Sequence, residues 1–168
     1  VVPSRQPVLG GDFVQFYTFG AAARLGEWTI QYDWPAFHAL QTSLVPVSDS
    51  YFYPPAYPPF VPLLYAPFSL LPFPLAYAVW TGLSTVTYCG LVTVAARGCR
   101  IVSTRHAVMA SLLFPPFIAH QAIGHSTVWP MMGFVGGWWA LTQSKPLVAG
   151  LLLSIVAIKP HLGMALAI

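Results

Sequence analysis

Only four side chains in the sequence are carboxylates, and each is a candidate general base: Asp12, Glu27, Asp33 and Asp49. A carboxylate beside a hydroxyl group can take its proton as the oxygen attacks an electrophile. Asp12 follows two glycines and Asp33 stands between two aromatic residues, which can shape a ligand site, whereas Glu27 and Asp49 lie in ordinary loop contexts. Alternatively, Asp12 can be the N-cap of a helix. The residues alone support this capping role at least as well as they support a catalytic one. Capping is the better explanation for Asp33.

Lys159 is a cation within a long apolar run, 14 residues after Lys145. At helical rise this is about 21 Å, which places the ammonium inside a bilayer and towards its far leaflet. An ionisable side chain at that depth is a candidate functional residue, because burying it costs at least about 2.5 kcal/mol. Pro160 interrupts the helix and frees backbone groups that can line a cavity. A phosphate is the natural partner of Lys159, and snorkelling to the interface is the alternative.

His125 is a candidate hydrogen-bonding residue rather than a metal ligand. It lies five residues after His120, a spacing that differs from metal-binding signatures such as H-E-x-x-H, and no carboxylate is close in sequence. A hydrogen bond to a phosphate or a sugar hydroxyl explains it, and a polar contact between helices explains it equally well. We therefore predict no metal site and no resident cofactor, with a divalent metal left open.

The composition indicates what kind of chain must position these residues. Of 168 residues, 57% are hydrophobic and only 7% are charged, whereas soluble domains carry about 25% charged residues. The net charge of +3 is spread thinly, which excludes a nucleic-acid-binding face, and the high hydrophobicity excludes disorder. The two cysteines form no C-x-x-C pair. The sequence thus predicts an all-α, multi-pass membrane protein.

The charge distribution predicts the topology. No charged residue occurs from Ser50 to Ala96, and Phe73 to Ala96 gives 24 uncharged residues, enough for one transmembrane helix. The basic cluster that follows, Arg97 to Arg105, is typical of a cytoplasmic end, so residues 1–49 are predicted to be extracytoplasmic. Further crossings are predicted at 106–123, interrupted at its two prolines, at 127–142 and at 147–168.

The chain therefore divides into three segments. Residues 1–49 are an extracytoplasmic loop with juxtamembrane helices, predicted at about 13–25 and 35–44 from apolar residues at helical spacing. Residues 50–72 comprise an aromatic and proline-rich run where the chain enters the bilayer and a short interfacial or re-entrant helix within 60–72. Residues 73–168 are transmembrane helices. Because the sequence lacks an initiator Met and stops inside an apolar run, we expect a fragment of a longer bundle.

Several motifs, in order along the chain, resemble the family-87 glycosyltransferases. They are Gly10-Gly11-Asp12-Phe13 with Tyr17 and Gly20, Tyr32-Asp33, Tyr57-Pro58-Pro59, Gly124-His125-Ser126 and Lys159-Pro160-His161-Leu162-Gly163. The resemblance implies a membrane-embedded enzyme of the GT-C type. Such enzymes transfer a sugar, typically mannose, from a polyprenyl-phosphate donor to a lipid or glycan acceptor at the outer face of a bacterial plasma membrane. The family often has Gly-Gln or Gly-His-Asn at the fourth motif and Lys-Pro-Gln at the last, so this chain departs from it at Ser126 and His161.

The resemblance favours catalysis over capping for Asp12, which becomes the expected general base of an inverting transfer. Lys159 is expected to bind the donor phosphate. Further substrate contacts are expected from His125, Asp33, His161 and Tyr57. The expected partners are the sugar donor, the acceptor and membrane lipids, with no nucleic acid. Two alternatives stay open: a secondary transporter, in which broken helices and an intramembrane lysine bind a solute, and a non-catalytic membrane protein.

Overall fold

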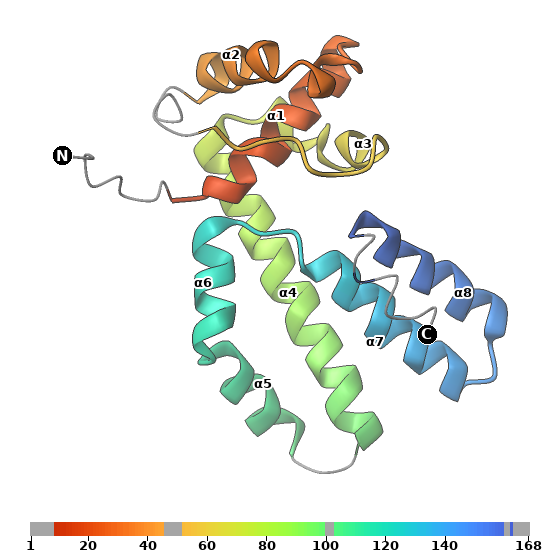
Figure 1. Ribbon diagram of the computed structural model, residues 1–168. Helices are drawn as coiled ribbons and strands as arrows, with labels where there is room; N and C mark the ends of the chain where they lie inside the picture. Colours follow the sequence, from red (N-terminus) through yellow and green to blue (C-terminus); the bar gives the residue numbers. More distant parts are fainter. Residues whose placement is uncertain (1–8, 46–51, 100–102, 160–161, 163–168) are drawn as a thin grey trace. The chain divides into compact units, whose positions relative to one another are not determined.

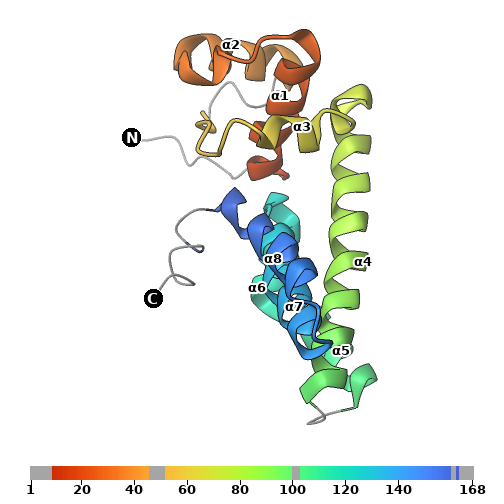
Figure 2. The same cartoon turned by 90° about the vertical axis from the view of Figure 1, so that its right-hand side faces the viewer.

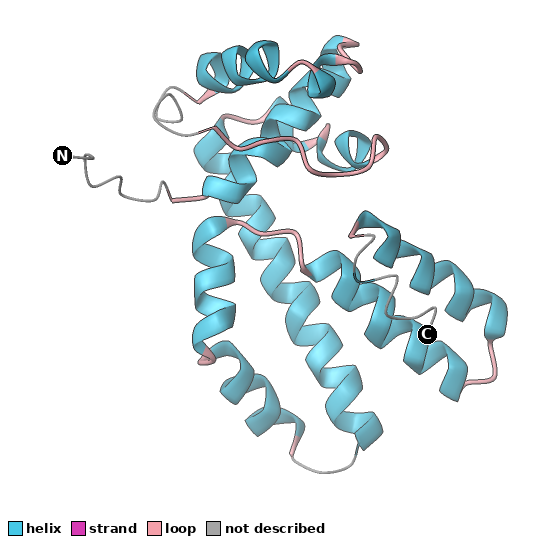
Figure 3. Cartoon of the chain, in the orientation of Figure 1, coloured by secondary structure: helices cyan, strands magenta, loops and turns pink. Residues whose placement is uncertain are grey.

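The computed structural model describes residues 9–45, 52–99, 103–159 and 162, and these residues form helices and loops without a strand (Figure 3). The elements are α1 (Gly11–Leu25), η1 (Ile30–Tyr32), α2 (Trp34–Leu44), α3 (Val61–Tyr65), η3 (Phe68–Leu70), α4 (Phe73–Cys99), α5 (Thr104–Leu112), α6 (Pro115–Ile123), α7 (Val128–Thr142), α8 (Pro146–Ser154) and η4 (Ile155–Ile158). The all-α prediction is confirmed for this part of the chain.

The chain divides into two compact units. Unit 1 comprises Val1–Thr81 and His120–His125, and unit 2 comprises Gly82–Ala119 and Ser126–Ile168. Helices α4 and α6 each contribute residues to both units. The beginning of α4 and the end of α6 therefore belong to the same unit as α1, although the three segments are far apart in sequence.

Helix α1 is the central element of unit 1 and packs against α2, α3 and η3 (Figure 1). Its sequence is apolar on all sides rather than along one stripe, which is typical of a buried helix. Accordingly, Phe13, Phe16 and Phe19 are at most 1% exposed. Gly20 permits a close approach to α3, because a Cβ atom at this position would collide with the backbone carbonyl of Tyr65.

Polar contacts attach the other segments of unit 1 to this core. The Tyr17 hydroxyl donates to the Leu71 carbonyl at 2.8 Å, and partial burial raises the pKa of the Tyr17 phenol, an effect that nearby Arg24 opposes. The Gln41 amide exchanges two hydrogen bonds with the backbone of Tyr53, at 3.1 and 3.2 Å. This amide pair attaches the extended proline-rich segment to α2.

Unit 2 contains the rest of α4, together with α5, the beginning of α6, α7, α8 and η4. Helices α7 and α8 lie side by side (Figure 2), and glycines permit this packing. A Cβ atom at Gly137 would lie 2.7 Å from Leu153 of α8, and one at Gly133 would lie 2.7 Å from Val156 of η4.

Helix α4 is long and apolar enough to cross a membrane. It begins at Phe73, as the predicted span does, and it extends beyond the predicted end at Ala96 to Cys99. Helices α5 and α6 are long and apolar enough to cross a membrane only when they are taken together. The chain bends by 56° between them, next to the two prolines at which the sequence predicts an interruption. The segment Pro146–Ile158 is apolar but shorter. The described part of the chain therefore has one such helix, or two if the bent pair is one span. The multi-pass bundle stays a prediction.

The helix predicted within 60–72 is divided into α3 and η3. Pro67 has no N–H group with which to continue the hydrogen bonding of α3, and the chain tightens into a 3₁₀ turn after it.

Candidate active site

Asp12 lies in the first turn of α1 and is not its cap. The N-cap is Gly10, whose positive φ of 76° suits glycine, and no side-chain hydrogen bond caps the helix. The capping explanation for Asp12 is therefore wrong. A carboxylate in the first turn still interacts favourably with the helix dipole, which stabilises its charged form. Asp12 thus places a partly exposed carboxylate at the beginning of a largely buried helix.

The motif Gly124-His125 ends helix α6 within the same unit. Gly124 has a φ of +69°, its N–H donates to the Gln121 carbonyl at 3.1 Å, and the N–H of His125 donates to the His120 carbonyl at 3.2 Å. These two bonds form a Schellman C-cap, in which a left-handed glycine closes the helix. The glycine is also required for packing, because a Cβ atom at position 124 would lie 2.6 Å from the Cβ of Phe13.

The structure brings Asp12 and His125 together. Oδ2 of Asp12 lies 3.6 Å from Nε2 of His125, and the side chains are 31% and 23% exposed, respectively. The His125 ring also stacks on His120, with centroids 4.5 Å apart and an interplanar angle of 22°. A partly exposed carboxylate beside an imidazole can accept a proton from a ligand hydroxyl, and the imidazole can stabilise charge at the same place.

A cluster of aromatic rings surrounds Phe13, the residue after Asp12. The Phe13 ring has six aromatic neighbours at centroid distances of 5.9 to 6.5 Å, namely Tyr17, Tyr65, Phe68, Phe73, Tyr77 and Trp80. Aromatic rings at such distances pack rigidly and contribute specific geometry as well as buried area. Phe13 is fully buried, so the residue after Asp12 lies in a closely packed core.

Lys159 belongs to unit 2, where it follows η4 and is only 9% exposed. Its Nζ donates to Oγ1 of Thr127 at 3.2 Å, and Thr127 is the N-cap of α7. A buried ammonium next to a helix N-terminus gives local positive charge that suits an anion. The burial and the contact argue against snorkelling, which would place the ammonium at an exposed surface.

The other predicted substrate contacts differ in their surroundings. Asp33 caps α2 by accepting a hydrogen bond from the N–H of Ala36 at 3.1 Å, which confirms the capping prediction. Tyr57 packs edge-on against Phe16 at 4.9 Å and is partly exposed. His161 lies outside the described residues.

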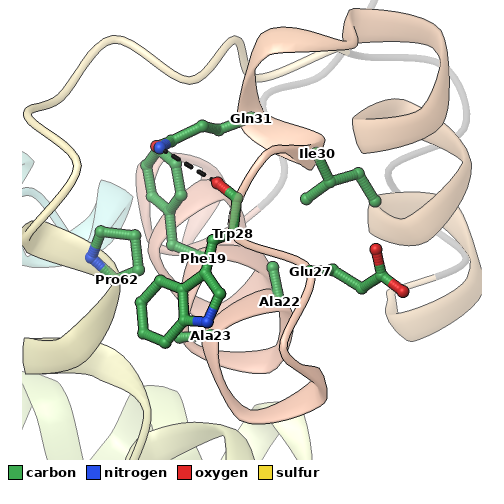
Figure 4. A pocket seen from close by; sticks show the side chains of 8 residues that line it. All are labelled: Phe19, Ala22, Ala23, Glu27, Trp28, Ile30, Gln31 and Pro62. Carbon is green, nitrogen blue, oxygen red and sulfur yellow. Dashed lines mark hydrogen bonds between the residues drawn. The ribbon is translucent and has the colours of Figure 1, made fainter.

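A small hollow on unit 1 is a separate feature (Figure 4). It is lined mainly by apolar groups, with the Trp28 indole turned towards Pro62, and Gln31 donates to the Trp28 carbonyl at 3.3 Å. The Glu27 carboxylate points away from the rings. Glu27, one of the four carboxylates considered as a base, lines the hollow, but none of the residues expected to bind substrate or to act as the base does, so the hollow is not the site that the sequence predicts. The described residues contain no group of three or more potential metal ligands.

The sequence predictions give no functional role to three residues that contact the predicted residues or the segments beside them, namely Thr127, Tyr77 and Trp80. Thr127 is the one with a sequence signal, because a Thr before an apolar helix is a typical N-cap. Tyr77 and Trp80 occur within the α4 sequence, where aromatic residues have no local feature that separates a packing role from a functional one. The fold, and not the neighbouring residues in sequence, determines which carbonyls the donors of Tyr77 and Trp80 reach.

Comparison with known proteins gives one match. The family model of glycosyltransferase family 87 matches residues 56–168, about two thirds of the chain. The matched range includes Tyr57, His125 and Lys159, and Asp12 lies before it. The comparisons found no match to a curated protein or to a solved structure.

Proposed function

The chain belongs to glycosyltransferase family 87, and we propose that it transfers a hexose, typically mannose, from a polyprenyl-phosphate donor to a lipid or glycan acceptor at the outer face of a bacterial plasma membrane. Membership of the family favours the enzyme over the transporter and the non-catalytic alternative. The observation that carries the mechanism is the Asp12 carboxylate beside His125, on a helix end that it does not cap.

The proposed reaction is a single displacement that inverts the sugar carbon. The acceptor oxygen forms a bond to C1 while the bond from C1 to the phosphate oxygen breaks, and the hydroxyl proton passes to the Asp12 carboxylate. The donor is a phosphodiester with one negative charge, so the departing polyprenyl phosphate gains a second. Positive groups held in place before the reaction stabilise that developing charge. Lys159 is the proposed source, with His125 contacting the phosphate or a sugar hydroxyl.

The Gly124-His125 part of the fourth motif has a structural role as well as the proposed functional one, because its backbone closes α6 and the His125 imidazole lies beside the proposed base. Tyr57, Asp33 and His161 are proposed as further substrate contacts.

The donor class is tested with full-length protein in nanodiscs. We expect transfer of radiolabelled mannose from polyprenyl-phosphate mannose to a lipid or glycan acceptor, and no transfer from the corresponding nucleotide sugar. Protein-free nanodiscs are the control. Transfer from the nucleotide sugar alone would contradict the proposed donor while leaving the family assignment intact.

The outer location is tested by cysteine labelling in whole cells. Ser43 on α2 and Ser103 before α5 are both exposed, so a cysteine at either position is accessible to a reagent on its own side of the membrane. With Cys89 and Cys99 replaced by alanine, a membrane-impermeant maleimide should label Ser43→Cys and spare Ser103→Cys. Permeabilised cells, in which both label, are the control. The reverse pattern would place the site in the cytoplasm.

A further inference from the structure

The beginning of α4 supplies hydrogen-bond donors to the end of α6. The Tyr77 hydroxyl lies 2.7 Å from the Gln121 carbonyl and 2.9 Å from the Ala122 carbonyl, and Nε1–H of Trp80 donates to the Gly124 carbonyl at 3.1 Å. The last carbonyls of a helix need partners from outside its own hydrogen-bond ladder. Here the donors come from another helix. They therefore satisfy the last carbonyls of α6 and also connect the end of α6 to α4.

The same tyrosine also contacts the beginning of α1. A Cβ atom at Gly10 would lie 3.1 Å from the Tyr77 ring, and so would one at Gly124. The N–H of Gly10 completes the arrangement by donating to the Ala122 carbonyl at 2.8 Å. One ring therefore packs against the residue two before Asp12 and the residue immediately before His125.

We propose that Tyr77 is a positioning residue, whose hydroxyl holds the α6 terminus so that His125 stays opposite Asp12 during transfer. Trp80 has the same role at Gly124. This inference rests on the proposed function and deepens it, because it assigns part of the transfer rate to a residue that touches neither substrate. A purely structural Tyr77 would affect stability without acting through His125.

A double-mutant cycle separates these two roles. Tyr77→Phe keeps the ring on both glycines and removes only the oxygen, so we expect kcat to fall about tenfold with KM within about twofold, since small displacements at a reacting centre are costly. In a His125→Ala background, where the group to be positioned is gone, the same change should cost less than about twofold. Residues that act through one another are non-additive in this way.

Tyr88→Phe is the matched control, because Tyr88 lies on the same helix and its hydroxyl is 3.5 Å from the Ser111 carbonyl. Its turnover should stay within about twofold of the wild type. Thermal unfolding of each purified variant shows whether it is folded. If Tyr77→Phe does not fold, Trp80→Phe takes its place in the cycle, because it removes the donor to Gly124 and keeps an aromatic ring.

Unchanged turnover by Tyr77→Phe, or equal losses in both backgrounds, would overturn the positioning role. The cycle is measured with whichever sugar donor the wild type uses, so an incorrect donor assignment does not affect it. Likewise, an active Asp12→Asn variant would refute the proposed base, whereas the coupling between Tyr77 and His125 would still be read directly. Failure of the proposed function and failure of this inference are thus distinguishable.

Discussion

Replacing Asp12 with asparagine in the full-length protein is expected to reduce sugar transfer about 100-fold or more, because an amide cannot take the proton of the acceptor hydroxyl. The change keeps the size of the side chain and its partial exposure beside His125. Since Gly10 and not Asp12 caps α1, the substitution removes no capping bond, and we expect the amount of inserted protein and its thermal unfolding to be unchanged. Turnover at saturating donor is the measurement.

Glu27→Gln is the matched control for this experiment. Glu27 is another carboxylate of unit 1, it is exposed, and it points away from the hollow beside it. The same loss of charge there should leave turnover within about twofold of the wild type. If Asp12→Asn transferred sugar as well as its parent, the base would have to be another carboxylate, and Asp33 would be the next to test.

Much of the helical structure is predictable because its causes are local. The uncharged residues from Phe73 to Ala96 are numerous enough to predict the long helix α4, and the prolines at 115 and 116 account for the break between α5 and α6. Asp33 followed by Trp34-Pro35 is a typical sequence signal for the N-terminus of a helix, and Asp33 caps α2 as expected. In each case the information lies within a few residues of the feature.

The candidate site is less predictable because it is assembled from distant segments. The sequence identifies Asp12 and His125 as candidates, but their contact depends on α1 and the end of α6 lying in one unit. The misassigned cap at Asp12 has a local cause, since two glycines precede it and either can start the helix. The roles of Tyr77 and Trp80 depend on which carbonyls their donors reach, and that is a property of the fold alone.

Replacing Lys159 with methionine is expected to reduce transfer about 100-fold, comparable to the loss of one preorganised donor to a developing anion. Methionine keeps the apolar stem and removes the charge, so insertion should become easier and expression should not fall. Arginine at this position should restore part of the activity, because it keeps the charge but presents a planar fork in place of a compact ammonium. The measurement is sugar transfer from polyprenyl-phosphate sugar in nanodiscs, normalised to the amount of inserted protein.

Lys145→Met is the matched control, because Lys145 is an exposed lysine at the N-terminus of α8 and its ammonium lies 5.9 Å from the Trp139 ring. Loss of charge there should not affect transfer. Thr127→Val tests the same site from the other side, because it removes the acceptor of the Lys159 hydrogen bond while keeping the shape of the side chain. Better expression of Lys159→Met with undiminished transfer would mean that the lysine does not bind the phosphate. The phosphate would then have to be held by another group, with His125 and His161 the next to test.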